Sequence, residues 1–309
     1  MGSMVETAAR RDGGGADGVE TRIAAMMRGS AAMRAPVGAI TVDVEEHFQV
    51  YALSERIARA DWDALETRVA ANTERILALF ARHGVKGTFF TLGWVAKRNP
   101  DLVRRIVAEG HELASHGYAH VPVHQQSPEA FRADVGRTKR LLEDLAGVPV
   151  AGYRAASFSV TRRTPWVHRV LAEEGYTYSS SVYPIVHDHY GLPDAPRDPH
   201  HPDTEGVLEI PVATTRLGGR AWPCGGGGYF RLLPYGLNRW ALTRARVREG
   251  RRNVFYFHPW EIDPGQPRVT GLSRRARFRH YTNLDRMERR LDKLLCEFSW
   301  DRMDRVFDL

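Results

Sequence analysis

The chain of 309 residues contains 43% hydrophobic and 26% charged residues, a composition typical of a folded protein large enough to bury a core and not of a disordered chain. Its formal net charge is +7, and no helix-turn-helix, RNA-recognition or zinc-finger pattern accompanies that charge. We therefore expect no nucleic-acid partner and interpret the excess arginine as a solvated surface, with attraction of an anionic polymer or an anionic membrane surface as the functional alternative.

The two cysteines, Cys224 and Cys296, are far apart in the sequence, which favours free thiols over a disulfide framework or a cysteine metal site. Residues 1–36 contain no apolar stretch long enough for a signal-peptide core or a membrane span. We predict that they form a disordered tail before a single domain at residues 37–309. By default, the chain is then expected to be cytoplasmic and to have no transmembrane segment.

From residue 37, short apolar runs alternate with segments of helical periodicity, a pattern that predicts an α/β fold with a mainly parallel sheet flanked by helices. The predicted strands are residues 38–42, 86–93, 112–116, 150–155, 207–216 and 252–261. The predicted helices are residues 62–84, 100–111, 127–147, 165–175 and 283–298. Proline and glycine are frequent in residues 183–236, so we expect long loops there, interrupted by the strand at 207–216.

Polar residues recur where the predicted strands end: Asp43 and Glu45, then His116, Arg154 and His258. The carboxyl ends of parallel strands meet on one face of an α/β fold, and active sites are built there. We therefore expect these side chains to form one site, although each of them taken alone also fits a structural role.

His116 and His120 stand four residues apart in the stretch "SHGYAH". On a helical turn this spacing brings both imidazoles to one face, within reach of a single ion. With thirteen histidines in the chain, such a pair is a weak signal by itself. A carboxylate from another strand end strengthens it, because two imidazoles and one carboxylate leave a bound Zn²⁺ one open position for water.

Seven stretches, in order, carry a resemblance that spans residues 39–268: "TVDVEEHFQV", "KGTFFTLGWVA", "HELASHGYAH", "GYRAASFSV", "YPIVHDHYGLPDAPR", "GGGYFRLLPY" and "FYFHPWEIDPGQPRV". The set resembles the NodB-homology polysaccharide deacetylases, carbohydrate esterases of the fourth family. It is most similar to the branch found with bacterial exopolysaccharide and exosortase loci. The stretch "FRHYTNLDRMERRLDKLL" extends the likeness towards the C-terminus.

The resemblance implies a distorted (β/α) barrel that holds a divalent metal, usually zinc, in one catalytic domain with a family-specific C-terminal extension. The implied metal ligands are Glu45, His116 and His120. The implied catalytic residues are Asp43 as the base, Arg154 as the arginine that orients it, and His258 as the general acid. Glu46 would be a residue of the rim, although an exchange of roles between Glu45 and Glu46 stays open.

Two positions depart from the family pattern. Ala156 stands where relatives of this branch have a proline, so the turn after the arginine loses a fixed φ. Ser179 stands where they have an aspartate that supports the acid histidine, which predicts a lower pKa for His258 and reduced activity. Aromatic residues near the motifs either wall a sugar groove or pack in the core: Tyr153, Phe158, Trp222, Tyr229, Phe230 and Trp260.

The function predicted from these residues is metal-dependent removal of N-acetyl groups from N-acetylhexosamine units of a polysaccharide, with an N-acetylated oligo- or polysaccharide as the partner. A non-haem iron oxygenase shares the ligand triad, but those enzymes normally have an all-β jelly roll and an H-x-D spacing that this chain lacks. A catalytically impaired glycan-binding protein is the other alternative. Ser179 favours it, and retention of the complete set of candidate site residues argues against it.

Overall fold

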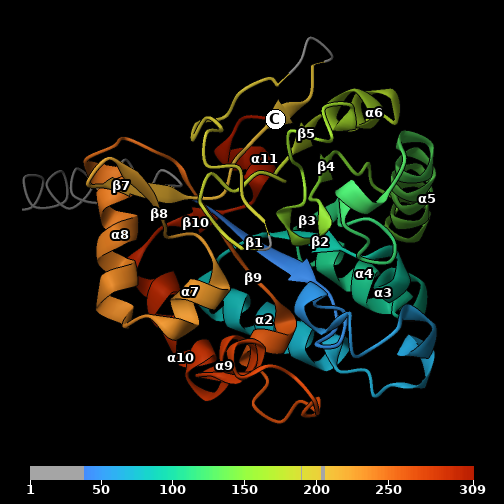
Figure 1. Cartoon of the computed structure of the whole chain (residues 1–309), viewed down its shortest axis with the longest axis horizontal. Coiled ribbons are helices and arrows are strands. Elements are labelled where there is room, and N and C mark those ends of the chain that lie inside the picture. The colour runs from blue at the N-terminus through green and yellow to red at the C-terminus, as the bar shows by residue number, and fades with distance from the viewer. Residues whose placement is uncertain (1–37, 189, 203–205) are drawn as a thin grey trace, which may run out of the picture. The chain divides into compact units, whose positions relative to one another are not determined.

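Parallel strands form the centre of the fold in the computed structural model, which describes residues 38–188, 190–202 and 206–309 (Figure 1). The strands of the main sheet are β1 (Gly38–Val44), β2 (Thr88–Thr91), β3 (Glu112–Ser115), β4 (Gly152–Tyr153), β5 (Tyr178–Ser179), β6 (Leu208–Glu209), β9 (Asn253–Phe257) and β10 (Trp300–Asp301). Their spatial order is β9-β1-β2-β3-β4-β5-β6, all parallel, and β10 pairs with the start of β1. The tail predicted at residues 1–36 lies outside the described residues.

β1 is buried along its whole length because β2 and β9 pair with its two edges and both of its faces are covered. Ile40 and Val42 belong to the main hydrophobic core. Successive side chains of a strand alternate between its two faces, so Thr41 and Asp43 point the other way, towards the inside of the curled sheet. Arg154, a buried arginine that directly follows β4, donates hydrogen bonds to both Thr41 and Asp43.

The chain after β6 closes the curled sheet into a distorted barrel. Ile210 donates its backbone N–H to Ser179 of β5, and three residues later Ala213 donates to Val254 of β9. This short segment therefore connects the two edges of the sheet. The (β/α) barrel expected from the family resemblance is confirmed.

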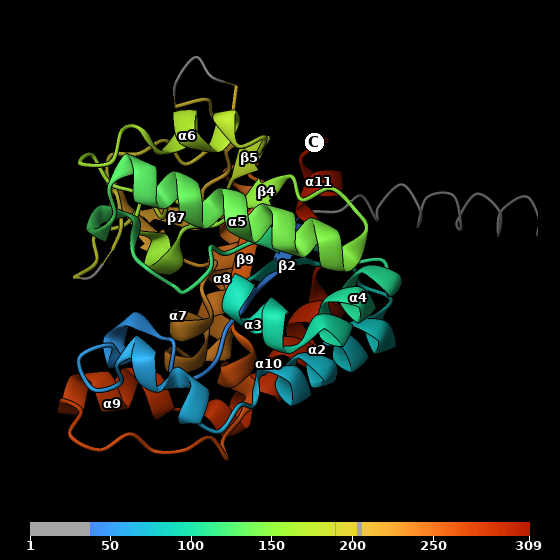
Figure 2. The same ribbon diagram turned by 90° about the vertical axis from the view of Figure 1, so that its right-hand side faces the viewer.

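Helices cover the outside of the barrel (Figures 1 and 2). The α-helices are α2 (Val69–His83), α3 (Gly93–Arg98), α4 (Pro100–Ala108), α5 (Pro128–Ala146), α6 (Val167–Glu173), α7 (Gly227–Leu232), α8 (Tyr235–Val247), α9 (Arg274–Tyr281), α10 (Leu284–Glu297) and α11 (Met303–Val306). The 3-10 turns are η1 (Tyr51–Leu53), η2 (Arg59–Ala64), η3 (Val123–Gln125), η4 (Ala156–Phe158) and η5 (Pro259–Ile262). Among the described residues, no helix is both long and apolar enough to cross a bilayer.

Local signals explain several of these boundaries. The Ser127 side chain accepts a hydrogen bond from Ala130 N at the start of α5, and Gly147 ends that helix in the left-handed conformation. Gly84, with φ of 62°, ends α2 in the same way. The helix predicted at 62–84 is wrong in its first part, because α2 begins only at Val69 and residues 59–64 form the separate turn η2.

The expectation of long loops over residues 183–236 is also wrong in part. The strand predicted at 207–216 divides into β6 and β7 (Thr214–Leu217), and β7 forms an antiparallel hairpin with β8 (Arg220–Pro223). Gly218 and Gly219 make the connecting turn, and both have the positive φ that a two-residue hairpin turn requires. The helices α7 and α8 follow directly, and α9 was not predicted either.

Candidate active site

One pocket, of about 470 Å³, lies where the carboxyl ends of the strands meet. Asp43 and Glu45 come from the end of β1, His116 follows β3, and His258 follows β9. These four side chains and that of His120 line the pocket. The structure therefore brings together the residues that the sequence placed at separate strand ends.

Glu45, His116 and His120 form the group of described residues whose candidate ligand atoms all lie within 4.8 Å of one another. Nε2 of His120 is 2.9 Å from Oε2 of Glu45, and Nε2 of His116 is 3.9 Å from the same oxygen. All three residues are buried. A carboxylate and two imidazoles within this distance of one another form a possible metal site.

A loop, and not a helical turn, brings the two histidines together. The stretch after β3 leaves the strand through Gly117, which has φ of 73°, and His120 itself has φ of 49°. The loop is fixed from outside, since Tyr118 N donates to the Asp134 carboxylate and Arg59 donates to two of the loop's carbonyl oxygens. The two histidines of the H-x-x-x-H stretch therefore do come together, but the expected helical turn is wrong.

The protonation of this group suits metal binding. Nδ1 of His116 lies 2.8 Å from the carbonyl oxygen of Arg154 and donates to it, which leaves the lone pair of Nε2 directed towards Glu45. Burial lowers the pKa of His116 to about 4, so the ring is neutral. Burial raises the pKa of Glu45, but the imidazoles of His120 and His258 outweigh it and lower that pKa to about 2.

Two buried atoms of the group have no hydrogen-bond partner: Oε2 of Glu45 and Nδ1 of His120. The contact of 2.9 Å between Glu45 and His120 lacks the alignment of a hydrogen bond, although the two side chains touch. Buried polar atoms are almost always satisfied, so this geometry is unusual for a structural cluster. It fits donor atoms arranged around a common cation.

Glu46 has a different task from Glu45. Its carboxylate accepts hydrogen bonds from the backbone N–H groups of Arg68 and Val69, at 2.9–3.0 Å, and so caps the start of α2. It is buried and is not a residue of the rim. Because its oxygens are committed to the helix, Glu45 is the better-placed ligand.

Asp43 is held by Arg154, whose guanidinium is fully buried. Nη1 of Arg154 donates to Oδ1 of Asp43 and to the Thr41 hydroxyl, both at 2.7 Å, while its other nitrogens donate to Ser180. Oδ2 of Asp43 is left facing the pocket, 3.9 Å from Nε2 of His258. One oxygen is thus anchored, and the other is available for chemistry.

His258 is oriented by a glutamate that the sequence reasoning missed. Oε2 of Glu261 accepts from the His258 backbone N–H at 3.0 Å and lies 3.2 Å from its Nδ1. Oε1 of Glu261 accepts from Nε of the buried Arg231 at 2.8 Å. Arg231 is fixed in turn by the carbonyl oxygens of Thr282 and Arg279. The sequence does carry a signal, since an acidic residue three positions after the N-cap residue, here His258, is a capping pattern.

Carboxylates surround His258 even though position 179 is a serine. Burial lowers the pKa of His258, but the carboxylates of Glu45, Glu261 and Asp43 outweigh it and raise that pKa to about 9. Glu261 thus supplies carboxylate support from another element, and a pKa lower than in relatives of this branch stays a prediction.

Ser179 instead belongs to a separate buried group. Its hydroxyl donates to Ser181. Burial raises the pKa of Glu209, but hydrogen bonds and charge from His168, together with a hydrogen bond from Ser179, outweigh burial and lower that pKa. Glu209 accepts from the backbone N–H groups of Ser181 and Val182 and lies 3.0 Å from the His168 ring. This group supports β5 and β6 and does not line the pocket.

The turn after Arg154 forms without the family's proline. Ala155 N donates to the Ser181 hydroxyl, and Phe158 N donates to Ala155 O, which closes η4. Ser157 and Phe158 have φ of 54° and 48°, a strained region for residues other than glycine. The turn sets the Phe158 ring against Tyr256, with ring centroids 4.6 Å apart, in the wall of the pocket.

The aromatic candidates divide into two groups. Phe158, Tyr229 and Trp260 line the pocket, and Trp260 Nε1 also donates to Oε1 of Glu45. Tyr153 does not, because it is buried in the core between Phe131 and Tyr176. Trp222 is half exposed on β8 and is not in the pocket lining, and Phe230 is a core residue. Tyr190 and Tyr256, which were not predicted, complete the wall.

Comparison with known proteins agrees with this geometry. Residues 61–179 match the family described as polysaccharide deacetylase. This part of the chain is similar to the polysaccharide deacetylases, in agreement with the resemblance to the NodB-homology family. Residues 180–308 match a second family, described as a domain of unknown function (DUF3473).

Curated relatives agree with the first family match, and a solved structure has a similar fold. The chain is 30% identical over 146 residues to a chitooligosaccharide deacetylase of Rhizobium leguminosarum bv. trifolii, a match that covers 47% of this chain and 61% of the relative. It is 37% identical over 75 residues to a peptidoglycan-N-acetylglucosamine deacetylase of Bacillus cereus, covering 24% and 27%. The fold is similar to that of a polysaccharide deacetylase of Mycobacterium smegmatis, with a TM-score of 0.56, 21% identity and coverage of 88% and 90%.

Both matched regions contribute residues to the same site. The first match contains His116, His120 and Arg154, while the second contains β9 and His258 with its partner Glu261. β9 pairs with β1 through five residues. The region of unknown function therefore completes the barrel and the pocket.

Proposed function

We propose that this chain is a metal-dependent hydrolase that removes N-acetyl groups from N-acetylhexosamine units of a polysaccharide. The observation that carries the proposal is the convergence of the Glu45, His116 and His120 donor atoms beside Asp43 and His258 in one pocket. The family and the activities named for its curated relatives support it. The chain covers less than two thirds of the length of those relatives, so the activity belongs to this proposal.

Glu45, His116 and His120 would hold the metal, and their two nitrogen donors and one oxygen donor favour zinc with an open position. A divalent metal bound there would lower the pKa of a bound water to about 7 and polarise the acetyl oxygen. The neutral state of His116 and the ionised state of Glu45 make both residues ready ligands.

Asp43 is placed to act as the general base. Its hydrogen bond with Arg154 fixes the carboxylate, while Oδ2 points into the pocket and can accept a proton from the attacking water. The oxygen of that water forms a bond with the acetyl carbon. Arg154 does not touch the substrate and acts by positioning Asp43.

His258 is placed to act as the general acid. The Glu261 carboxylate accepts from its Nδ1–H and so keeps Nε2 directed towards the pocket. Despite burial, the carboxylates of Glu45, Glu261 and Asp43 raise the pKa of His258 to about 9 in the metal-free chain, and Glu261, which is not a proposed metal ligand, would continue to favour the protonated ring when the metal is bound. As the carbon–nitrogen bond breaks, Nε2 delivers its proton to the departing sugar nitrogen, and acetate and a free amine are the products.

The walls of the pocket suit a sugar. Phe158, Tyr229 and Trp260 line the pocket; Tyr229 is partly exposed, while Trp260 is stacked against His258 and His280. A partly exposed aromatic ring such as that of Tyr229 can pack against the apolar face of a hexose. We further propose that the natural polymer is an exopolysaccharide, on the basis of the resemblance to the branch associated with exopolysaccharide loci.

The test measures acetate release from N-acetylated oligosaccharides together with the metal content of the purified protein. The expected result is about one divalent ion per chain, with acetate release that is lost on chelation and restored by zinc. A His116→Ala, His120→Ala double variant should lose both metal and activity. Full metal content in that variant would contradict the assigned ligands, and glycan binding without acetate release would favour the glycan-binding alternative.

A further inference from the structure

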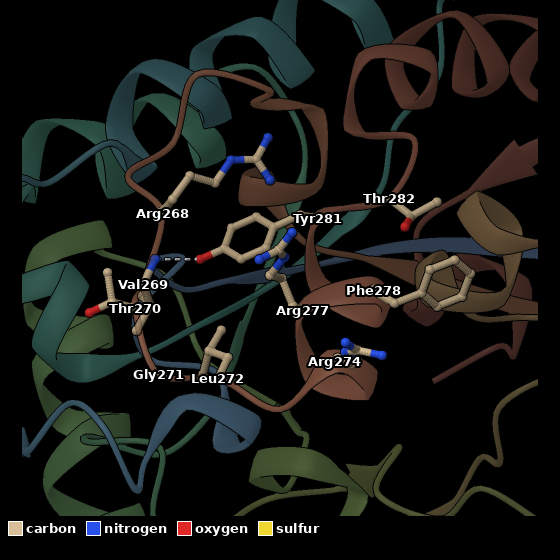
Figure 3. A pocket seen from close by; sticks show the side chains of 10 residues that line it. All are labelled: Arg268, Val269, Thr270, Gly271, Leu272, Arg274, Arg277, Phe278, Tyr281 and Thr282. Atoms are coloured by element: carbon tan, nitrogen blue, oxygen red, sulfur yellow. Dashed lines mark hydrogen bonds between the residues drawn. The ribbon is translucent and has the colours of Figure 1, made fainter.

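A second pocket, of about 1000 Å³, lies beside α9 (Figure 3). It is formed by the loop at residues 268–272 and by one face of α9, with Thr282 just beyond the helix. The Tyr281 hydroxyl accepts a hydrogen bond from Val269 N at 2.8 Å and ties the loop to the helix. This pocket is therefore a defined surface feature that the proposed hydrolysis does not use.

The charged residues that line this pocket are all arginines. Arg268, Arg274 and Arg277 are exposed, and none of them forms an ion pair with a carboxylate of the described residues. The Arg56 guanidinium lies against Gly271 at the edge of the same loop. By contrast, the arginines on the other face of α9, Arg275 and Arg279, are paired with Asp188.

The remaining lining favours a carbohydrate ligand over a bare anion. No acidic residue is among the residues that line this pocket, while Phe278 presents a side chain that is 59% exposed. An exposed aromatic ring beside unpaired guanidinium groups can pack against a sugar ring while the cations bind its acidic substituent. The guanidinium carbon of Arg268 lies over the Tyr281 ring, 4.3 Å from its centroid, a cation–π contact that leaves the group without a carboxylate partner among the described residues.

The position of the pocket connects it to the candidate active site. Ser273, Arg275, Ala276 and Arg279 of the same helical segment line the active-site pocket, whereas Arg274, Arg277 and Phe278 line the arginine pocket. The two pockets are thus separated by a single helix, which is about 10 Å wide. A polymer that occupies the first pocket needs to cross only α9 to reach the second.

We propose that the arginine pocket binds the carboxylate groups of an acidic polysaccharide, so that the substrate is an N-acetylated polymer that also contains uronic acid units. The binding of the acidic units stands on the pocket alone. The placement of the neighbouring N-acetylhexosamine in the active site rests on the proposed function. Part of the net charge of +7 would then serve to attract the acidic polymer.

The test compares two oligosaccharides of equal length, one of N-acetylglucosamine alone and one in which glucuronate alternates with N-acetylglucosamine. Calorimetry on the wild-type chain should show tighter binding of the acidic oligosaccharide, and the preference should shrink as salt rises from 0.1 M towards 1 M, where the screening length falls from about 10 Å to about 3 Å. An Arg274→Gln, Arg277→Gln double variant should weaken binding of the acidic oligosaccharide by roughly three- to tenfold, since two exposed ion pairs are lost.

The matched control is an Arg246→Gln, Arg248→Gln double variant, which removes the same charge from the C-terminal end of α8 and its C-cap, outside both pockets. It should keep the preference for the acidic oligosaccharide. Equal affinity of the wild-type chain for both oligosaccharides would overturn the proposal, as would an equal loss in both double variants. Binding to anionic vesicles that depends on Arg274 and Arg277, without any preference among oligosaccharides, would identify a membrane surface and also overturn it.

Calorimetry separates this proposal from the proposed function, because binding needs no turnover. Acidic-oligosaccharide binding that depends on the two arginines, in a chain that releases no acetate from either oligosaccharide, would support the pocket and contradict the hydrolase. Acetate release with the same KM for both oligosaccharides would support the hydrolase and contradict the binding of acidic units in the arginine pocket.

Discussion

Replacement of Glu261 by glutamine perturbs the support of His258 while keeping the shape of the side chain. The carboxylate accepts hydrogen bonds from the His258 backbone, from His258 Nδ1 and from Arg231, at 2.8–3.2 Å. A glutamine has only one oxygen, so its NH₂ group must face a donor of either His258 or Arg231. One buried donor then loses its partner, and Arg231, which is 1% exposed, loses its counter-charge.

Breaking a buried ion pair costs about 3–5 kcal/mol, and we expect about 3 kcal/mol because Arg231 keeps its bonds to two carbonyl oxygens. Turnover should fall roughly 10–100-fold, as for other residues that orient a site residue from behind. Urea unfolding of the chelated proteins at pH 7 measures the first quantity, and acetate release by the zinc-loaded proteins measures the second.

The stabilisation by Glu261 should depend on pH in one direction, set by the shift of its pKa. Burial raises the pKa of Glu261, but Arg231 and His258 outweigh it and lower that pKa to about 2, against an ordinary value of 4.5. The stabilisation by the ionised carboxylate is therefore fully present above pH 4.5 and is lost as the pH falls towards 2. The difference in unfolding free energy between wild type and Glu261→Gln should narrow over that interval.

Glu112→Gln is the matched control, since Glu112 is also buried but lies at the opposite end of β3, where it accepts from the Thr88 and Tyr178 hydroxyls. Burial raises the pKa of Glu112, so glutamine resembles its protonated form, and the cost should be only about 1 kcal/mol. A loss below about 1 kcal/mol in Glu261→Gln, with normal turnover, would refute the reasoning.

Asp43→Asn should keep the metal while turnover falls by roughly 10²–10⁴, because only the base is removed; loss of the metal would make Asp43 a ligand. Glu46→Ala should lower the unfolding free energy by about 1–2 kcal/mol, as for other lost helix caps, with metal content unchanged in elemental analysis. Ser179→Asp should destabilise the chain, because it adds a buried carboxylate beside Glu209. It should leave the alkaline limb of the pH–rate profile of His258 in place, and an upward shift of that limb would show that position 179 does act on the acid.

Local patterns in the sequence predict the parallel sheet, its flanking helices and its catalytic edge, whereas the closure into a barrel is implied only by the family resemblance. The apolar run of β1 and the glycine at the end of α2 are visible without any tertiary information. The site residues Asp43, His116 and His258 follow from the rule that parallel strands present their carboxyl ends on one face.

The rest depends on contacts that are distant in sequence. Glu46 follows a strand as Glu45 does, and only the position of α2 shows that it caps a helix. The support of His258 by Arg231 joins residues from two elements, and no single stretch of sequence indicates that pairing. The α9 segment, which contains five arginines or histidines among eight residues, lacks the apolar periodicity on which helix prediction relies.

Titration of the chelated chain with zinc, with acetate and free amine measured from the same N-acetylated oligosaccharide, tests the central claim most directly. The account predicts that both products appear in equal amounts and that the rate rises with added zinc until about one ion is bound per chain. Release that is independent of the metal, or no release at any zinc concentration while the oligosaccharide still binds, would contradict it.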